Sequence, residues 1–266
     1  MSIDTNPDGD FRIERDGVIA TITLDRPAKR NALTPASLGQ LENLAEGFRD
    51  EPDIRAVIIR AEGDHFSVGA DLAAVGGSPQ PTVQLRRSAE QGARLMRAIR
   101  EIHQPTICVV QGIATGAATC IASACDFRVA TTTARMGYGE VKLGINLMWN
   151  ALPLAVELVG PARAKRLVMS GDLIDAETLH GWGFVDEVVA PDARDAAALA
   201  MAQRYAALPP VAVQMIKRSV NALSGALSAS IMHADADQWL LGTRTADFTE
   251  AVSAFMEKRP ASFSGQ

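Results

Sequence analysis

The sequence predicts an α/β fold in which buried, mostly parallel strands alternate with helices. Three continuous apolar runs, at residues 56–60, 106–111 and 126–130, are typical of strands that are buried on both faces. Segments with helical spacing or small residues lie between these runs, so the order is strand, helix, strand, helix, strand. Of the 266 residues, 47% are hydrophobic and 21% are charged, which is enough apolar material to bury a core of this kind.

The first fifty residues predict two strands followed by a helix. Residues 1–10 are polar and are expected to form a loose tail. Residues 11–15 and 18–24 predict short strands joined by a tight turn. Over residues 35–50 apolar side chains recur at helical spacing, and Thr34 is a candidate N-cap because proline occupies the next position.

The middle of the chain predicts two further helices. Residues 83–102 have helical spacing, and five arginines there fall within an arc of about 140°. This arginine row is either a solvated helix face or a patch that faces a phosphate or a second subunit; its members are Arg86, Arg87, Arg94, Arg97 and Arg100. Residues 112–116 predict a turn that leads into a helix of small residues at 117–124.

The C-terminal part predicts helices separated by proline or glycine, after a last strand at 184–189. The expected helices span residues 193–207, 211–223, 227–241 and 245–258. We therefore expect an α/β core over residues 1–190 and a helical region over residues 191–266, packed on this core or on a neighbouring subunit. These helices carry apolar residues on more than one face, which favours a homo-oligomer; examples are Ile231, Met232, Trp239, Leu240 and Leu241.

Composition excludes several classes of protein. The chain has 26 Lys and Arg and 31 Asp and Glu, which gives a net charge of −5. A negative net charge argues against a nucleic-acid partner. Three cysteines without a CxxC pair and four histidines without ligand spacing predict neither a metal site nor a disulfide framework. The N-terminus is acidic, and no apolar stretch approaches about 20 residues, so no signal peptide or membrane span is expected. These features are typical of a cytoplasmic protein.

Two segments of small residues are the remaining candidates for a site, because the common catalytic motifs are absent. Ser67 is not expected to be a nucleophile, since His65 stands where the nucleophile elbow needs glycine. The segments at 66–72 and 112–118 each follow a buried strand, and the second opens a helix. Small side chains let a ligand approach the backbone, and a helix start presents unpaired N–H groups. Two such groups that converge on one carbonyl oxygen would form an oxyanion hole; tight strand–helix packing is the alternative.

Six motifs in a fixed order support a more specific interpretation. Residues 66–72 read FSVGADL, and residues 111–126 run from Gln-Gly to Cys-Asp. The other four are Leu24–Leu33, which contains Arg26-Pro27 and Asn31; Met169–Asp172; Gly183–Asp186; and Ala254–Arg259. In these motifs the sequence resembles the enoyl-CoA hydratase/isomerase (crotonase) superfamily, and the likeness covers nearly the whole chain.

The resemblance implies a crotonase-like spiral of ββα units with a C-terminal helical trimerisation region, and trimers that often pair into hexamers. It also implies an acyl-CoA substrate, whose thioester carbonyl is polarised by two backbone N–H groups so that an enolate is stabilised. By position these donors are Ala70 and Ala117. The family usually has glycine at the second position; Ala117 keeps its N–H, so the role survives if its φ is negative.

Coenzyme A is implied as part of the substrate, with no permanently bound cofactor. The positions that match residues lining its nucleotide and pantetheine are Ala28, Lys29, Val68, Ala70 and Asp71. Phe255 and Lys258 match residues that reach a coenzyme A bound in the adjacent subunit. Both lysines could equally be ordinary solvated side chains.

The acid and base residues depart from the hydratase pattern. Hydratases of the family use two glutamates, and the resemblance places the second at Glu140. The first position is occupied by Cys120, and a neutral thiol cannot replace a carboxylate that moves protons near neutral pH. Cys120 is therefore expected to form a wall of the substrate pocket rather than to act as a nucleophile.

A second departure follows at residues 146–150, where hydratases carry a glycine-rich turn. Met148 and Trp149 are bulky and should reshape the acyl pocket. The dehalogenase branch of the family has a nucleophilic aspartate near Met148, so that chemistry is disfavoured. Asn146 and Asn150 would either orient a polar substrate group or cap the following helix.

The functional expectation is an enzyme that forms a CoA-thioester enolate with Glu140 as its one carboxylate. Double-bond isomerisation needs a single base and fits best, and hydration or its reverse, the lyase direction, is close behind. The alternatives are a decarboxylase or thioester hydrolase, and, from a different class, a non-catalytic CoA-binding assembly protein. The expected assembly is a homotrimer or a dimer of trimers.

Overall fold

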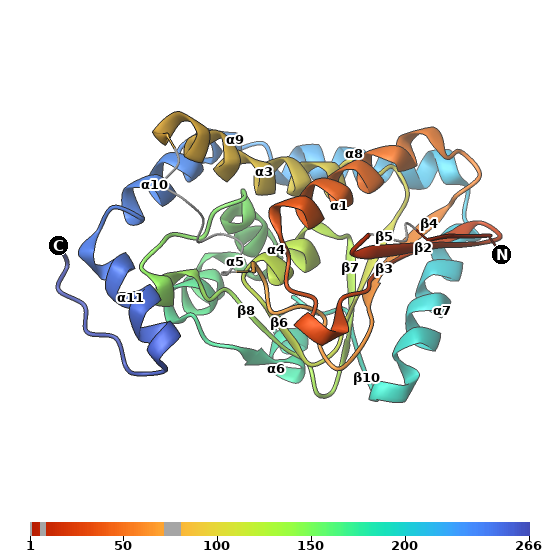
Figure 1. Ribbon diagram of the computed structural model, residues 1–266. Coiled ribbons are helices and arrows are strands. Elements are labelled where there is room, and N and C mark those ends of the chain that lie inside the picture. Colours follow the sequence, from red (N-terminus) through yellow and green to blue (C-terminus); the bar gives the residue numbers. More distant parts are fainter. Residues whose placement is uncertain (1, 6–8, 72–80) are drawn as a thin grey trace.

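The computed structural model describes residues 2–5, 9–71 and 81–266 (Figure 1). Leu72, the last residue of the small-residue segment at 66–72, lies outside the described residues. The larger of two sheets has seven strands in the order β1-β2-β3-β4-β5-β7-β10. Its strands are β1 (Ser2–Thr5), β2 (Phe11–Asp16), β3 (Ile19–Leu24), β4 (Ala56–Ala61), β5 (Thr106–Val110), β7 (Phe127–Thr131) and β10 (Glu187–Val189).

The sheet is antiparallel at one edge and parallel elsewhere. Strands β1, β2 and β3 pair antiparallel, whereas β3–β4, β4–β5, β5–β7 and β7–β10 pair parallel. The expectation of a loose tail over residues 1–10 is wrong for residues 2–5, which pair with residues 12–15. The edge of β2 offers a row of backbone N–H and C=O groups, and β1 satisfies them.

A second, three-stranded sheet has the order β6-β8-β9 and consists of β6 (Ile113–Thr115), β8 (Arg135–Gly137) and β9 (Ile174–Asp175). The chain passes from β5 in the large sheet to β6 in the small one, then through a helix to β7 and β8, which repeat the pattern. A bridge between Ser67 and Ala114 places the segment after β4 beside β6 as well. This repetition is the expected ββα spiral. The turn expected over residues 112–116 contains β6, which is too short to show a strand period.

Helices cover both faces of the large sheet, which explains the continuous apolar runs. Val57 and Ile59 face the core under α1 (Pro35–Gly47), α3 (Thr82–Arg100) and α4 (Ala117–Ala124). Ala56 and Ile58 face the other way and pack with alanines of α7 (Arg194–Ala206). Alternate side chains of one strand are thus buried on opposite faces. Thr34 caps α1, since its Oγ1 accepts the Ser37 N–H at 3.1 Å.

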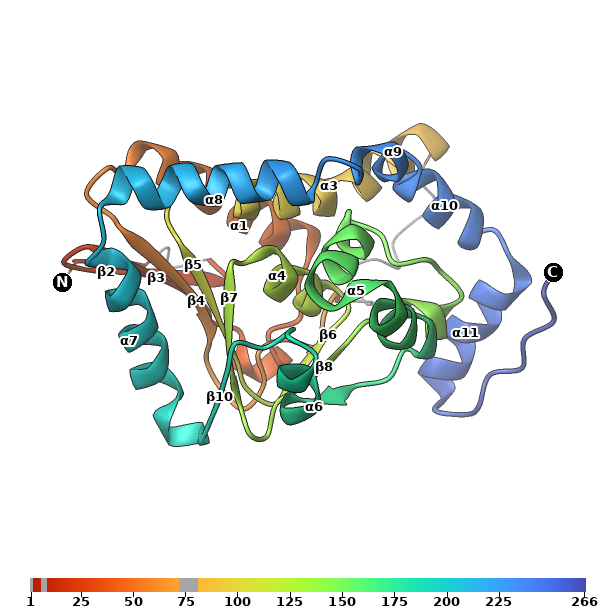
Figure 2. The same cartoon turned by 180° about the vertical axis from the view of Figure 1, so that it is seen from behind.

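The remaining α-helices of the described residues all follow α4 in the chain. They are α5 (Ala151–Ser170), α6 (Ala176–Gly181), α8 (Pro210–Ser224), α9 (Ala229–Met232), α10 (Asp235–Gly242) and α11 (Ala246–Glu257). Figure 2 shows α8 along the same side as α1 and α3, with α10 and α11 at the end far from the sheet. One helix over residues 227–241 was expected, and the structure has α9 and α10 instead. A new helix start at Asp235 is favourable because Asp235 and Asp237 then lie in its positive first turn.

None of the helices in the described part of the chain combines the length and apolar content that a bilayer crossing requires. The same described residues contain no group of three or more His, Cys, Asp or Glu side chains arranged to hold a metal ion.

Candidate active site

The first small-residue segment is fixed to the chain at residues 30–33. The Leu33 N–H donates to Gly69 O and the Asp71 N–H to Leu33 O, each at 2.8 Å. Ser67 Oγ donates to Asn31 O at 2.7 Å and accepts the Gly69 N–H at 3.1 Å. The parallel pairing of Leu33 with Ala70 uses the Gly69 carbonyl and the Asp71 N–H. The trans peptide bond points the Ala70 N–H away from the Gly69 carbonyl. The Ala70 N–H itself is therefore left to point elsewhere.

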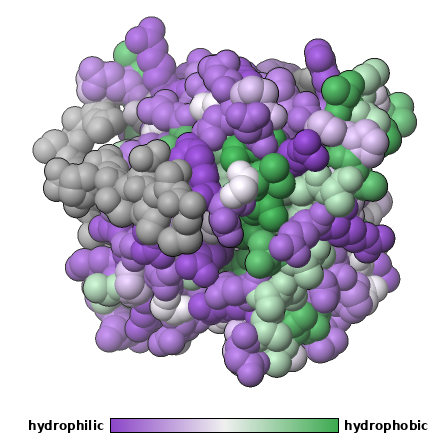
Figure 3. All heavy atoms as spheres, turned by 90° about the vertical axis from the view of Figure 1, so that its right-hand side faces the viewer, coloured by the Kyte–Doolittle hydropathy of each residue, from purple (hydrophilic) through white to green (hydrophobic). Residues whose placement is uncertain are grey.

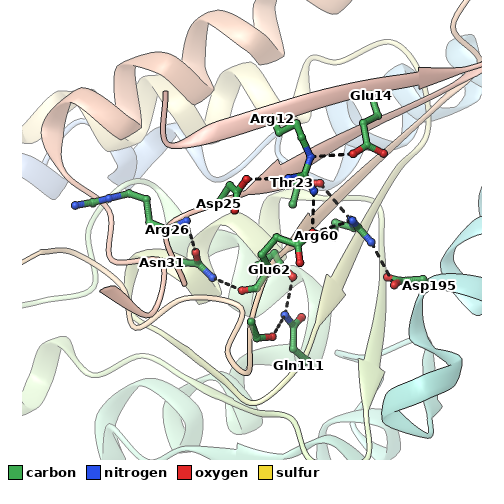
Figure 4. A network of polar contacts seen from close by, with 12 residues as sticks. Arg12, Glu14, Thr23, Asp25, Arg26, Asn31, Arg60, Glu62, Gln111 and Asp195 are labelled. Atoms are coloured by element: carbon green, nitrogen blue, oxygen red, sulfur yellow. Dashed lines mark hydrogen bonds and ion pairs between the residues drawn. The ribbon is translucent and has the colours of Figure 1, made fainter. Parts of the chain in front are cut away.

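Asn31 is the brace of this arrangement, which gives a structural reason for the motif at Leu24–Leu33. Its Oδ1 accepts the Arg26 N–H at 2.8 Å, and its Nδ2 donates to Glu62 O at 2.9 Å and His65 O at 3.0 Å (Figure 4). Its φ is +53°, a conformation that asparagine tolerates better than most residues. The network continues through the Glu62 carboxylate to the guanidinium of Arg12 at 2.8 Å.

The second segment meets the first at the start of α4. A Cβ added to Gly69 would lie 2.5 Å from Thr115 O and 3.6 Å from Ala117 N, so the two backbones touch and residue 69 has no room for a side chain. Gly116 has φ +56°, and Ala117 then begins the helix without a positive φ. The condition for Ala117 to present its N–H is therefore met. An N–H in the first turn has no acceptor within its own helix.

Glu140 lies against this junction. It begins the 3₁₀ segment η3 (Glu140–Leu143), and a Cβ added to Gly116 would lie 3.2 Å from its Oε1. Its Oε2 is buried and has no hydrogen-bond partner among the described residues. Burial raises the pKa of Glu140 to about 7. A carboxyl group with this pKa can both accept and return a proton near neutral pH.

Cys120 lies on α4, one helical turn after Gly116, and is 2% exposed. Burial raises the pKa of its thiol well above the usual value, and the negative charges of Glu140 and Asp235 act in the same direction. A neutral thiol is a poor nucleophile, so burial argues against the nucleophile alternative for Cys120.

The turn at residues 146–150 is built differently from the expectation. Met148 and Trp149 are half-buried, and the Trp149 ring lies against Gly92 of α3. The capping alternative for the two asparagines is wrong. Asn150 precedes α5 in a left-handed conformation and makes no side-chain cap, while the Asn146 amide reaches Asp235 and Gln238 on α10.

The candidate coenzyme A residues lie in three places. Ala28 and Lys29 are exposed on the 3₁₀ segment η1 (Pro27–Lys29), and Val68 and Asp71 are half-buried in the loop beside Ala70. Phe255 is 60% exposed on α11, and Lys258 ends that helix with φ +55°. Helix α11 packs against η3.

The arginine row on α3 is largely paired within the chain. Arg86 binds Asp237 at 2.6 Å, Arg94 binds Glu42 at 3.0 Å and Arg100 binds Glu157 at 3.1 Å. A solvated face with internal ion pairs describes these three side chains.

Asp235 is the group that the sequence did not indicate. Its Oδ2 accepts the Asn150 N–H at 2.7 Å, and it contributes to the electrostatic environment of Cys120. It lies 85 residues beyond Asn150 in the sequence. No local pattern connects residues at such a separation, so only the fold brings Asp235 to the site.

The structure is a spiral α/β fold in which two backbone segments and a buried carboxyl group meet, and this combination defines a class of enzyme. Comparison with known proteins gives the family. The sequence model of the enoyl-CoA hydratase/isomerase family matches residues 14–266. A crotonyl-CoA hydratase of Syntrophomonas wolfei is 31% identical over 252 residues, which is 94% of this chain and 96% of the relative. A 1,2-epoxyphenylacetyl-CoA isomerase of Escherichia coli is 29% identical, covering 93% of this chain and 95% of the relative.

Solved structures agree with these sequence matches. An enoyl-CoA hydratase/isomerase from Pseudoalteromonas atlantica has a TM-score of 0.85 at 27% identity, and the match covers 96% of this chain and 100% of that one. The chain therefore belongs to the enoyl-CoA hydratase/isomerase family, within the crotonase superfamily. It is an enzyme of this family of CoA-thioester enzymes.

Proposed function

We propose that the enzyme binds an acyl- or enoyl-CoA thioester with its carbonyl oxygen between the N–H groups of Ala70 and Ala117, and that Glu140 transfers the proton. The observation that supports this most directly is the buried carboxyl group of Glu140, which lies beside Gly116 at the start of α4 and has a pKa of about 7.

The simplest reaction is isomerisation of a double bond. The Glu140 carboxylate removes a proton from a carbon next to the unsaturated system, and the electron pair moves toward the thioester carbonyl. The resulting enolate oxygen is stabilised by the two N–H groups. Glu140, now protonated, returns the proton at another carbon, so that no atom is gained or lost. One carboxyl group is sufficient for both steps.

Hydration is the second candidate, and the names of several relatives favour it. The relatives include a crotonyl-CoA hydratase and a 2,3-dehydroadipyl-CoA hydratase. With one carboxylate, Glu140 would take a proton from water as the oxygen adds to the β-carbon, and would then give that proton to the α-carbon. The reverse sequence is the lyase direction. Cys120 takes no part in either reaction.

The coenzyme A portion arrives and leaves with the substrate. The loop at Val68–Asp71 lies beside the oxyanion position, and it would contact the pantetheine. Ala28 and Lys29 on η1 would contact the nucleotide, and Phe255 and Lys258 on α11 would reach a coenzyme A bound to a second copy.

A panel of acyl-CoA thioesters, followed by mass spectrometry and chromatography, tests the reaction type. Hydration adds the mass of water, decarboxylation and hydrolysis remove mass, and isomerisation changes retention without a change in mass. Glu140→Gln should lower kcat by about 10²–10⁴-fold, with little change in substrate binding. Glu187→Gln, at an exposed glutamate of β10, is the matched control. Full activity of Glu140→Gln would move the proton transfer to another group.

We also propose that the enzyme assembles as a homotrimer or a dimer of trimers, with α8 at the interface. Hydrophobic side chains reach the surface on the side that carries α7 and the start of α8 (Figure 3). Along α8 and just beyond it, Val211, Met215, Leu223 and Leu227 are between 64% and 86% exposed. Cavities of about 840 and 510 Å³ open beside the same helix. Sedimentation should give at least three copies, and a monomer at micromolar concentration would refute this.

A further inference from the structure

The turn at residues 146–150 holds a bulky side chain in a costly backbone conformation. Trp149 has φ +65° and Asn150 has φ +58°, so two consecutive residues other than glycine are left-handed. Asparagine tolerates this region, but for a bulky residue it is an outlier. Such strain persists only where the surroundings impose it, and it clusters at functional sites. The question is which contacts hold Trp149 in place.

Asp235 holds the turn from the side of α10. Its Oδ2 accepts the Asn150 N–H at 2.7 Å, a bond that the charge of the carboxylate strengthens. The Asn146 amide donates to Asp235 O at 3.3 Å and lies 3.4 Å from its Oδ1. Both ends of the turn are thus bonded to one residue. The neighbouring Asp237 is exposed and binds Arg86 instead.

Gly92 receives the indole ring on the opposite side. It is a buried residue within α3, and a Cβ added there would lie 2.0 Å from Cδ2 and Cε2 of Trp149. The ring therefore occupies the space of the missing side chain. Glycine is unfavourable inside a helix, and here the close approach of the ring leaves no space for a larger residue. Helix α10 also packs on α3, so the turn is enclosed between the two helices.

This enclosed turn is continuous with the candidate active site. Ile145 directly precedes the turn, and its N–H donates to Glu140 O at 3.2 Å. A main-chain hydrogen bond therefore joins the start of the turn to the residue that we propose as the proton-transfer group. The charges of Glu140 and Asp235 both act on the Cys120 thiol, so Asp235 also lies near the candidate active site.

We propose that Asp235 is a positioning residue, which holds the Asn146–Asn150 turn so that Trp149 stays against Gly92 and closes the acyl end of the substrate pocket. The acyl part of this inference rests on the proposed function, whereas the positioning part does not. Trp149 would then be the side chain that limits the length of the acyl group, and Asp235 would act on selectivity through it.

The first experiment compares Asp235→Ala and Asp235→Asn with the control Asp237→Asn, all in a Trp182→Phe/Trp239→Phe background in which Trp149 is the only tryptophan. Asp235→Ala should shift the Trp149 emission, and Asp235→Asn should shift it less because its amide oxygen can still accept the Asn150 N–H. Asp237→Asn should leave the emission unchanged. Unchanged emission in Asp235→Ala would overturn the positioning role.

The second experiment measures kcat and KM of the same variants for a short-chain and a long-chain acyl-CoA. In Asp235→Ala and in Trp149→Ala, the ratio of kcat/KM between long and short chains should rise by at least about tenfold, mainly through KM. Asp237→Asn should keep the ratio within about twofold. A uniform loss for both chain lengths in Asp235→Ala would indicate a merely structural role and overturn the proposal.

A double-mutant cycle tests the contact itself without any substrate. Gly92→Ala should lower the melting temperature by about 5 °C because its Cβ collides with the indole. The same change in a Trp149→Ala background should cost much less, and equal costs in both backgrounds would refute the contact. If the unmodified enzyme turns over no acyl-CoA, the proposed function fails, while the emission and the cycle still decide whether Asp235 positions Trp149.

Discussion

The two parts of the candidate site are built in opposite ways. Around Ala70 and Ala117 the geometry is made by main-chain hydrogen bonds and small residues, and the positive φ angles fall on Gly69 and Gly116 and on the supporting residues Arg30 and Asn31. At the other end, the turn at 146–150 is held by the Asp235 carboxylate of α10 and by packing of the Trp149 ring beside Gly92 of α3, and the positive φ angles fall on Trp149 and Asn150.

This difference predicts opposite sensitivities. Ala70 and Ala117 should tolerate changes of side chain that preserve the backbone, and the site should fail when one of their N–H groups is removed. The turn should instead respond when Asp235 or Gly92 is changed, because the Asp235 carboxylate and the space beside Gly92 hold it in place. The first part would then set the chemistry, and the second part would set the choice of acyl group.

Among changes to these two parts of the site, removal of an oxyanion donor should have the largest effect. Ala117→Pro deletes the N–H at the first position of α4, where proline is otherwise well accommodated. We expect kcat to fall by about 10²–10³-fold, as for the loss of one oxyanion donor elsewhere. Ala117→Gly keeps the N–H and should stay near the activity of the unmodified enzyme. A similar loss in both variants would show that backbone strain, rather than the donor, is responsible.

The buried carboxyl of Glu140 should make stability depend on pH. Because burial raises its pKa from 4.5 to about 7, the folded protein binds this proton more tightly than the unfolded chain. This contribution is fully present below about pH 4.5 and is lost as the pH rises through 7; it amounts to about 3 kcal/mol.

Denaturant unfolding of the unmodified enzyme and of Glu140→Gln between pH 5 and 8 measures this contribution. The difference in stability between the two proteins should move in favour of Glu140→Gln as the pH rises. Asp235, whose pKa burial raises to about 6, is present in both proteins and cancels. A difference that does not change with pH would show that the carboxyl is not desolvated in the folded enzyme.

Loss of the Asn31 brace should have an intermediate effect on stability. Asn31→Ala removes three hydrogen bonds and leaves alanine with φ +53°, so we expect a loss of about 2–4 kcal/mol in unfolding free energy. Asn31→Gly loses the same bonds but adopts this φ freely, and it should be about 1 kcal/mol less destabilised. Equal losses would show that strain at residue 31 contributes nothing.

Cys120→Ala should have the smallest effect. Turnover of the true substrate should stay within tenfold, about 1.4 kcal/mol, because the neutral thiol only forms part of a wall. A thousandfold loss in a normally folded variant would instead identify a catalytic thiol. Cys120→Glu sharpens the comparison, since it restores the first glutamate of the hydratase pattern and should raise the hydration of crotonyl-CoA where water can enter.

Local signals in the sequence predict the parts of the fold that depend on neighbouring residues. The apolar runs at 56–60, 106–111 and 126–130 correspond to β4, β5 and β7, and the helix expected at 117–124 is α4. These elements are long or strongly apolar, so their period or burial shows in the sequence. The family motifs also led to Ala70, Ala117 and Glu140, which the fold brings together.

Other parts depend on distant residues and could not be predicted in this way. Strands β6 and β8 have three residues each and show no period. The separation of α9 from α10 follows the position of Asp235, whose partner Asn150 lies 85 residues away. The contact between Gly92 and Trp149 likewise joins two elements that only the tertiary fold brings together.

The burial of all three cysteines makes each thiol a reporter of local opening. Cys108 lies in the central strand β5, Cys125 follows the end of α4, and Cys120 lies within α4 at the candidate site. A thiol reacts only when it is exposed and ionised, so the rate of labelling measures how often its surroundings open. We expect labelling of Cys108 to follow global unfolding, whereas labelling of Cys120 should follow local opening around α4. An acyl-CoA bound at the candidate site would slow the labelling of Cys120 directly. It would slow the labelling of Cys108 only through its effect on the stability of the whole fold.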